Sequence, residues 1–201
     1  MATFALEYPL APESPFPAAF DAAVATLTRL GDDYDAVVVA GDSAGGGLTL
    51  ATVAQASRAG VNVAAAAVFS PFADLTLSGD SMQRFAVGDP LLDPAFIAGC
   101  ASAYRGSTPA SDPRVSPVFD HKDGMPPLLI QVGSDELLLD DSLRYADGVE
   151  KAGGRVQLEV WQGMHHVFQL NVVELASARA ALDTAGAFLR THVAAAASPR
   201  W

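Results

Sequence analysis

Short apolar runs alternate along the chain with stretches in which apolar residues recur every three or four positions. The short runs predict strands, at 3–8, 35–40, 63–69, 128–133 and 155–161. The recurring positions predict helices, at 18–30, 44–59, 94–104, 140–152 and 174–192. Strands that alternate with helices are typical of a mostly parallel sheet with helices on both faces. The predicted fold class is therefore α/β.

The pattern loosens between residues 72 and 125, where glycines and prolines interrupt short pieces and only the helix at 94–104 is well defined. Loose segments over a rigid sheet commonly shape a binding cleft, and the alternative is a plain surface excursion. No repeat and no linker divides the sequence. We therefore expect residues 1–201 to form one domain, with a cleft-forming segment at about 72–125.

Composition limits the classes of binding partner and the cellular compartment that we expect. The net charge is -11, which disfavours nucleic acid and anionic membranes as partners, because both require clustered Lys and Arg. The single cysteine, Cys100, has no His or Cys near it at metal-ligand spacing, so we interpret it as a helix core residue. One cysteine fits a reducing compartment, and the sequence shows neither an export signal nor a membrane-spanning run. The expected location is the cytoplasm.

The strand predicted at 35–40 leads into Gly41-Asp42-Ser43-Ala44-Gly45, where the pattern changes from strand to helix. A Gly-x-Ser-x-Gly turn holds its serine in a strained conformation, and the small residues two before and two after it allow the tight fold. The turn would lift the Ser43 hydroxyl above the sheet and aim the first free amides of the helix at an oxyanion. The alternative is a glycine-rich loop that binds phosphate or merely turns.

Two other polar groups follow predicted strands. Asp135 comes after the strand at 128–133, and His166 comes after the strand at 155–161. Because chemistry in such sheets gathers at the carboxyl ends of the strands, we expect Ser43, Asp135 and His166 at one edge. Their order along the chain, serine then acid then histidine, matches the α/β-hydrolase arrangement.

With these residues placed, the chain resembles the hormone-sensitive-lipase-like branch of the α/β-hydrolases, the bacterial carboxylesterases related to arylacetamide deacetylase. The segment 8–13 is similar to the family's Tyr-Arg-Leu-Ala-Pro-Glu, with Pro9 where arginine is usual. Further stretches resemble the family's elbow, the loop before the acid strand, the acid turn and the histidine turn: Gly41-Asp42-Ser43-Ala44-Gly45-Gly46, Asp112-Pro113-Arg114-Val115-Ser116-Pro117, Gly133-Ser134-Asp135-Glu136-Leu137 and Gly163-Met164-His165-His166-Val167-Phe168. These stretches cover nearly the whole chain in order.

The family's His-Gly-Gly-Gly loop, which donates two backbone amides to the oxyanion, has no counterpart before Tyr8. By this resemblance the chain corresponds to the carboxyl-terminal part of a typical member, without the first strands and the amino-terminal cap helices. In the family's sheet a strand from the missing region lies between the strands corresponding to 3–8 and 35–40. Its absence leaves unpaired backbone edges, from which we predict a homodimer with exchanged or edge-paired strands.

The resemblance also implies the role of each site residue. Ser43 is the nucleophile, His166 the base that activates it, and Asp135 the acid that orients the imidazole. The family's catalytic histidine stands two before phenylalanine, which selects His166 over His165. In the oxyanion hole Ala44 supplies one backbone amide, while the customary other donors lie in the glycine loop.

The remaining polar residues receive structural interpretations. Glu136, Asp140 and Asp141 are rivals of Asp135, and we interpret the last two as helix caps or dipole partners. Asp42 is expected to hold the turn through backbone hydrogen bonds. His165 is expected to be a loop or cleft-lining residue. His121 and His192 are expected to face solvent.

The leading hypothesis is a serine carboxylesterase that hydrolyses small, short-acyl esters through an acyl-enzyme, with no metal or organic cofactor. The alternative is a catalytically weak α/β-hydrolase that binds a small ligand or a partner chain. Retention of the serine, acid and histidine favours the enzyme, while loss of the glycine loop favours the binding domain.

Overall fold

The computed structural model of the chain describes residues 2–84 and 88–196. Four strands form one sheet in the order β1-β2-β3-β4, and every neighbouring pair is parallel. The strands are β1 (Val37–Asp42), β2 (Val63–Phe69), β3 (Leu128–Gly133) and β4 (Val156–Trp161). The α/β fold class and the parallel sheet predicted from the alternation are therefore confirmed.

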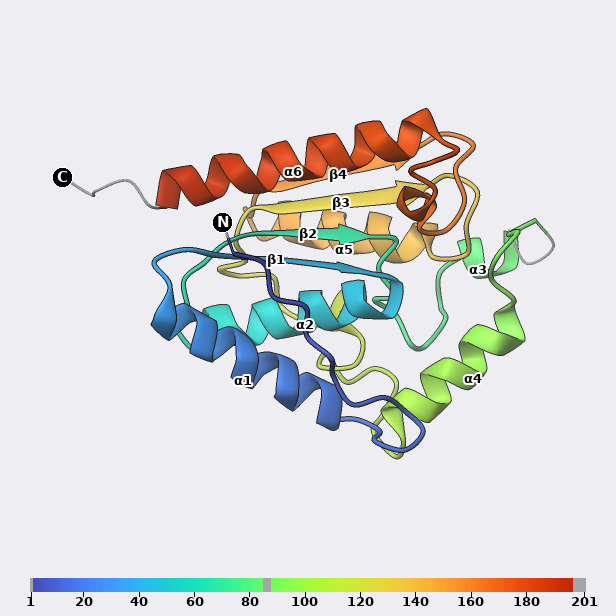
Figure 1. Cartoon of the computed structure of the whole chain (residues 1–201). Coiled ribbons are helices and arrows are strands. Elements are labelled where there is room, and N and C mark those ends of the chain that lie inside the picture. Colours follow the sequence, from blue (N-terminus) through green and yellow to red (C-terminus); the bar gives the residue numbers. More distant parts are fainter. Residues whose placement is uncertain (1, 85–87, 197–201) are drawn as a thin grey trace.

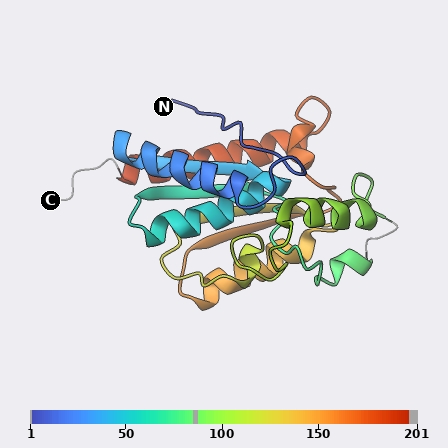
Figure 2. The same cartoon turned by 90° about the horizontal axis from the view of Figure 1, so that it is seen from below.

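Helices cover both faces of the sheet (Figures 1 and 2). α2 (Ser43–Arg58) and α5 (Leu139–Lys151) lie on one face, α6 (Ala176–Ala196) lies on the other, and α1 (Ala18–Asp33) packs against α2. Alternate residues of a strand point to opposite faces, so Ala66 joins the core beneath α2 and α5, while Ala67 packs against Ala185 of α6. The central strands β2 and β3 are thus buried on both faces.

The segment between β2 and β3 contains α3 (Ser81–Arg84), α4 (Pro94–Arg105) and the short 3₁₀-helix η1 (Pro117–Phe119). α4 begins where the sequence predicts, because Pro94 fits the first helical position and the Asp93 carboxylate accepts hydrogen bonds from two backbone N–H groups of the first turn. It ends at Gly106, which has a φ of 54°. Figure 1 shows α4 apart from the sheet, beyond the carboxyl ends of its strands.

The strand predicted at 3–8 is wrong. Among the described residues, 2–9 make no backbone–backbone hydrogen bond, and β1 pairs only with β2. A strand needs the backbone of a neighbour, and these residues have none beside them. The segment instead runs beside α1 (Figure 2), and the Phe4 ring meets the Tyr34 ring edge-on with 5.8 Å between their centroids.

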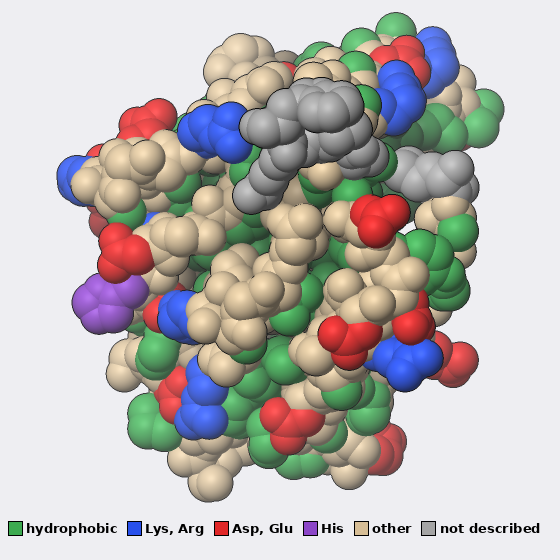
Figure 3. All heavy atoms as spheres, turned by 90° about the vertical axis from the view of Figure 1, so that its left-hand side faces the viewer, with side chains coloured by type: hydrophobic (Ala, Val, Ile, Leu, Met, Phe, Trp, Pro, Cys, Tyr) green, Lys and Arg blue, Asp and Glu red, His purple; other side chains and the backbone are tan. Residues whose placement is uncertain are grey.

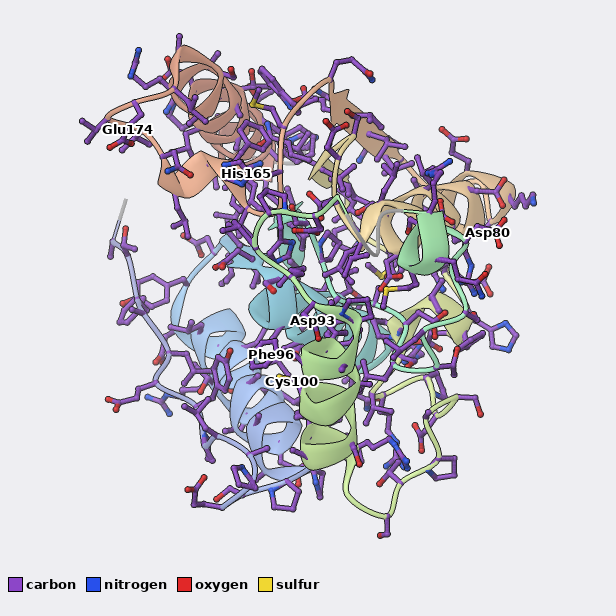
Figure 4. All side chains as sticks on the ribbon, turned by 90° about the vertical axis from the view of Figure 1, so that its right-hand side faces the viewer. Asp80, Asp93, Phe96, Cys100, His165 and Glu174 are labelled. Carbon is purple, nitrogen blue, oxygen red and sulfur yellow. The ribbon has the colours of Figure 1, made fainter. Side chains whose placement is uncertain are left out.

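The two ends of the sheet differ in character. The side that carries the amino ends of the strands shows acidic and basic side chains interspersed with apolar atoms (Figure 3). The opposite side, at the carboxyl ends, gathers the helix starts and the long loops (Figure 4). No helix within the described residues is long and apolar enough to cross a bilayer.

Candidate active site

Ser43 is the first residue of α2, directly after β1. Its φ is 51°, a left-handed conformation that costs a residue other than glycine about 1–3 kcal/mol. A side chain on Gly41 would overlap the carbonyl oxygen of Gly45, so the tight turn requires glycine at 41. The Ser43 carbonyl in turn accepts a hydrogen bond of 2.9 Å from the Phe72 N–H after β2. The predicted strained turn is therefore present.

His166 lies beside Ser43. Its Nε2 is 2.9 Å from the Ser43 Oγ, and the side chain is buried. For Nε2 to accept the hydroxyl proton, the other ring nitrogen, Nδ1, must carry the hydrogen. His165 does not reach the serine in this way, because its Nδ1 lies 2.9 Å from the carbonyl oxygen of His166. The structure thus brings Ser43 and His166 together, as the sequence predicts.

The acid beside His166 is Glu136, and the prediction of Asp135 is wrong. The Glu136 Oε1 lies 3.2 Å from His166 Nδ1, and the Glu136 side chain is completely buried. Asp135 points to the surface, where its Oδ1 accepts a hydrogen bond of 2.6 Å from the Ser134 hydroxyl. The backbone N–H of Asp135 is held by the Met164 carbonyl at 3.1 Å, which fixes the turn so that the next side chain faces the histidine.

Ser70 is the supporting residue that the sequence analysis missed. Its hydroxyl donates a hydrogen bond of 2.8 Å to Glu136 Oε2 and accepts one of 3.1 Å from the N–H of Val167, the residue after the histidine. The Gly133 N–H donates to the same Glu136 oxygen at 2.9 Å. The available signal was position, because Ser70 directly follows β2 at the carboxyl edge. The acid and the histidine loop are therefore held by one hydroxyl.

The start of α2 offers free backbone donors. Ala44 is the second residue of the helix, where N–H groups have no carbonyl partner within the helix. The residue is exposed and borders the cavity beside Ser43. An anion next to Ser43 would meet both these N–H groups and the positive end of the helix dipole.

A cavity of about 510 Å³ opens beside Ala44. It lies between the amino-terminal segment, the first turns of α2 and the inner side of α4, and most of its lining is apolar. Cys100 lines it and is exposed, so the prediction of a helix core residue is wrong. α4 does not pack its whole length against the sheet, and its inner side faces this cavity (Figure 4). Part of the loose segment 72–125 thus shapes a cleft.

Two tyrosines at the cavity titrate far from the neutral range. Burial raises the pKa of Tyr104 to about 12, with a smaller contribution from Tyr8. Burial also raises the pKa of Tyr8, and the charge of Asp42 adds to the effect. Both hydroxyls therefore keep their protons near neutral pH and remain hydrogen-bond donors.

Asp140 and Asp141 lie in the first turn of α5, as expected of dipole partners, but neither caps the helix, and their side chains hold a loop. The Asp141 Oδ2 accepts hydrogen bonds of 2.8 Å from the N–H groups of Ala73 and Asp74, and the N-cap residue of α5, Leu138, makes no side-chain cap hydrogen bond. The Asp140 Oδ2 accepts one of 2.8 Å from the Ser81 N–H. These bonds tie α5 to the loop that follows β2.

Three further expectations concern single residues. The Asp42 side chain makes no hydrogen bond with a described residue, so its predicted role in holding the turn is wrong. His121 is exposed, as predicted. His192 is half-buried, with its Nδ1 2.8 Å from the Phe188 carbonyl oxygen.

Residues 1–170 match the family model for the alpha/beta hydrolase fold. The chain is 43% identical to an acetyl-hydrolase of Streptomyces hygroscopicus over 94% of its own length and 65% of that protein. It is 38% identical to an esterase of Acinetobacter venetianus, over 82% of its own length and 56% of that protein. The chain thus spans less than two thirds of the length of these curated relatives.

Solved structures agree with the fold. An esterase from the bacterial hormone-sensitive lipase family superimposes with a TM-score of 0.90 and 35% identity, covering 94% of this chain and 65% of that one. A hormone-sensitive lipase from a metagenome library superimposes with a TM-score of 0.89 and 38% identity, over 94% of this chain and 66% of that one.

Proposed function

The chain belongs to the α/β-hydrolase family, and from this membership and the geometry at Ser43 we propose that it is a serine carboxylesterase acting on small, short-acyl esters. The observation that carries the proposal is the chain of hydrogen bonds from the Ser43 hydroxyl through His166 to the buried Glu136. The relatives named esterase and acetyl-hydrolase support the same reaction class.

In the first half of the reaction, the Ser43 Oγ attacks the ester carbonyl carbon while His166 Nε2 takes the hydroxyl proton. The imidazolium that forms is stabilised by the Glu136 carboxylate, which also keeps the ring in the tautomer needed for attack. The Ala44 N–H donates a hydrogen bond to the carbonyl oxygen and stabilises the negative charge that develops on it. His166 then gives its proton to the departing alcohol, and an acyl group remains on Ser43.

In the second half, a water molecule takes the place of the alcohol. His166 removes a proton from the water, the resulting hydroxide attacks the acyl carbon, and the carboxylic acid leaves as the proton returns to Ser43. The three side chains carry the proton transfers, and the amides at the start of α2 donate to the oxyanion. Burial of His166 and Glu136 strengthens their interaction, because the surrounding protein screens charge less than water does.

The test is hydrolysis of p-nitrophenyl acetate and butyrate by the parent and by Ser43→Ala. We expect the parent to release nitrophenol and the variant to fall to the uncatalysed rate, since the acyl-enzyme can no longer form. A fluorophosphonate probe should label the parent at Ser43 and leave the variant unlabelled. Equal rates for the two proteins would refute the esterase, and an unlabelled parent would favour the ligand-binding alternative.

We also propose that two copies of the chain associate through the outer edge of β1. Support comes from the backbone of this strand, which is paired on one side only among the described residues. Unpaired strand edges readily join a second chain, because each exposed N–H and carbonyl group seeks a partner. Light scattering at micromolar concentration tests the idea, and a strictly monomeric mass would contradict it.

A further inference from the structure

The loop that carries His166 is held in a conformation that its sequence does not favour. Val167, directly after the histidine, has a φ of 45° and a ψ of 44°, in the left-handed region. A β-branched side chain is crowded there, and such a conformation costs about 1–3 kcal/mol and persists only where the surrounding structure holds it. The contacts that hold this loop therefore also fix the position of His166.

Two side chains outside the loop hold it. The first is Ser70, whose hydroxyl accepts the hydrogen bond from the Val167 N–H. The second acts through Gln169, which lies in the short 3₁₀-helix η2 (Phe168–Leu170) three residues after His166. The Gln169 Nε2 donates a hydrogen bond of 3.2 Å to the Oε1 of Gln131 in β3, and both side chains are buried. The loop is thus tied to β3 as well as to the residue that follows β2.

The orientation of the Gln131 amide is set by its other neighbours. Its Nε2 donates hydrogen bonds of 2.8 Å to the Glu159 carboxylate and of 2.9 Å to the Ala181 carbonyl. A carbonyl, like an ionised carboxylate, accepts and cannot donate, so both hydrogens of the amide nitrogen point to these two partners. The Oε1 must then face Gln169. Gln131 therefore links the histidine loop to β4 and α6, which lie side by side in Figure 1.

The backbone of Gln131 reaches the first support as well. Its carbonyl accepts a hydrogen bond of 2.8 Å from the N–H of Ser70, whose hydroxyl binds both Glu136 and the Val167 N–H. Gln131 is the single polar side chain in the strand Leu128–Gly133, and a polar group in such a buried strand is costly unless it is hydrogen-bonded. Here its hydrogen bonds connect the segments that carry the acid and the base.

We propose that Gln131 is a positioning residue of the active site. It holds the strained histidine loop from the α6 face of the sheet, so that His166 Nδ1 stays on Glu136 and Nε2 stays on Ser43. Its effect on the reaction rate rests on the esterase function proposed above. Its effect on the histidine ring does not, because the ring can be observed without turnover.

Three substitutions separate this role from plain packing. Gln131→Met keeps an unbranched side chain of similar length and removes the amide. Gln169→Met breaks the same link from the loop and leaves the bonds of Gln131 to Glu159 and Ala181 in place. Gln157→Met is the matched control, because the exposed Gln157 donates 2.7 Å to the other oxygen of Glu159. Circular dichroism confirms folding, and if Gln131→Met does not fold, Gln169→Met decides.

The first readout is the tautomer of His166, from ¹⁵N NMR of the protein labelled at histidine, with His166→Gln assigning the signal. We expect the Nδ1–H form to predominate in the parent, because Glu136 accepts that hydrogen. Gln131→Met and Gln169→Met should raise the share of the Nε2–H form, whereas Gln157→Met should not. A loss of packing alone would lower stability and leave the tautomer unchanged. An equal change in Gln157→Met would overturn the proposal.

The second readout is turnover of p-nitrophenyl acetate. We expect Gln131→Met and Gln169→Met each to lower kcat by about ten-fold with little change in KM, because the reacting groups are displaced while the substrate contacts remain. The double variant should fall no further than Gln131→Met, since one link cannot be broken twice. Fully additive losses would show that the two side chains act separately, and would overturn the link.

The outcomes also distinguish this proposal from the esterase. If the parent neither hydrolyses esters nor reacts with the fluorophosphonate, yet the tautomer changes as expected, the esterase fails and the positioning role stands. If the parent is active and both Met variants keep its tautomer or its kcat, the positioning role of Gln131 fails and the esterase stands.

Discussion

The two sides of Ser43 differ in polarity and in burial. On the histidine side, polar groups are buried and connected, from Ser43 through His166 to Glu136 and on to Ser70. On the α4 side, the lining is apolar, the cavity is open, and Phe96 keeps 65% of its surface exposed. A buried hydrogen-bond network tolerates little change in geometry. If one side chain moves, its partner is left without a hydrogen bond in surroundings that screen charge weakly. An apolar cavity tolerates change, because hydrocarbon contacts have little directionality.

On the histidine side the reacting groups must be placed exactly, whereas on the α4 side the residues that line the cavity can vary. A shift of about 1 Å at a reacting group can cost a hundred-fold in rate, whereas an added or missing methylene in an apolar pocket costs about 1–3 kcal/mol. Substitutions on the histidine side should therefore affect every ester alike. Those on the α4 side should change which ester is preferred.

The largest effect is expected at Glu136. Replacing it by Gln keeps the shape and removes the negative charge that holds His166 in its tautomer and stabilises the imidazolium. We expect kcat to fall by about ten-thousand-fold on p-nitrophenyl acetate and on p-nitrophenyl butyrate alike, by analogy with the loss of the acid in other serine hydrolases. Steady-state kinetics on both esters measures the loss, and circular dichroism confirms that the variant is folded.

Asp135→Asn is the matched control, because it removes the same charge one residue away. Asp135 is exposed and bonded to the Ser134 hydroxyl, so we expect the variant to keep a kcat near that of the parent. The opposite pattern, in which Asp135→Asn is inactive and Glu136→Gln is not, would restore Asp135 as the acid.

A smaller effect is expected at Ser70, which positions the acid and the histidine loop without touching the serine. Ser70→Ala leaves the buried Val167 N–H without its partner, at a cost of about 1–3 kcal/mol in the free energy of unfolding. The resulting displacement should lower kcat by about ten- to a hundred-fold with little change in KM. Kinetics and urea denaturation measure the two effects.

Ser142→Ala is the control for Ser70. Ser142 is equally buried, yet its hydroxyl has no hydrogen-bond partner among the described residues. Removing it should leave both kcat and the free energy of unfolding close to those of the parent. A loss of kcat as large as that of Ser70→Ala would show that any buried serine near the sheet matters, and that the bridge to Glu136 does not.

The same contrast explains how far the sequence could predict the molecule. The strands, the helices and the Ser43 turn follow from local patterns, because each depends on residues that are close in the chain. The acid was predicted one residue too early, because Asp135 and Glu136 both follow β3. Which of them faces the histidine depends on hydrogen bonds to distant segments, such as the one that the Asp135 N–H donates to the Met164 carbonyl.

Other features depended on contacts that no local pattern contains. Ser70 lies 66 residues from Glu136, and its position after β2 indicates the carboxyl edge of the sheet but does not indicate which residue it contacts there. The segment 3–8 has the composition of a strand, and it forms none because no backbone lies beside it. Cys100 was interpreted as a core residue because no metal-ligand partner is near it in the sequence, and it faces the cavity because α4 stands away from the sheet.

The last prediction concerns Asp141, which lies between the two sides, and its expected effect is on stability and not on the rate. Its Oδ2 holds the N–H groups of Ala73 and Asp74, next to Phe72, which bonds to Ser43 and also lines the cavity. The pKa of Asp141 is raised to about 8, because burial, with a smaller contribution from the Asp74 charge, outweighs the opposing effect of the two N–H groups and Arg144. Between about pH 4 and pH 8 the folded protein therefore keeps a proton that the unfolded chain releases, so the free energy of unfolding should fall as pH rises, by about 1.4 kcal/mol per pH unit at most.

Asn at 141 can accept the same two hydrogen bonds without titrating, so Asp141→Asn should flatten this slope in urea titrations across the window. Asp147→Asn, on the exposed side of α5, is the control for net charge, and an equal flattening in both variants would remove Asp141 as the cause.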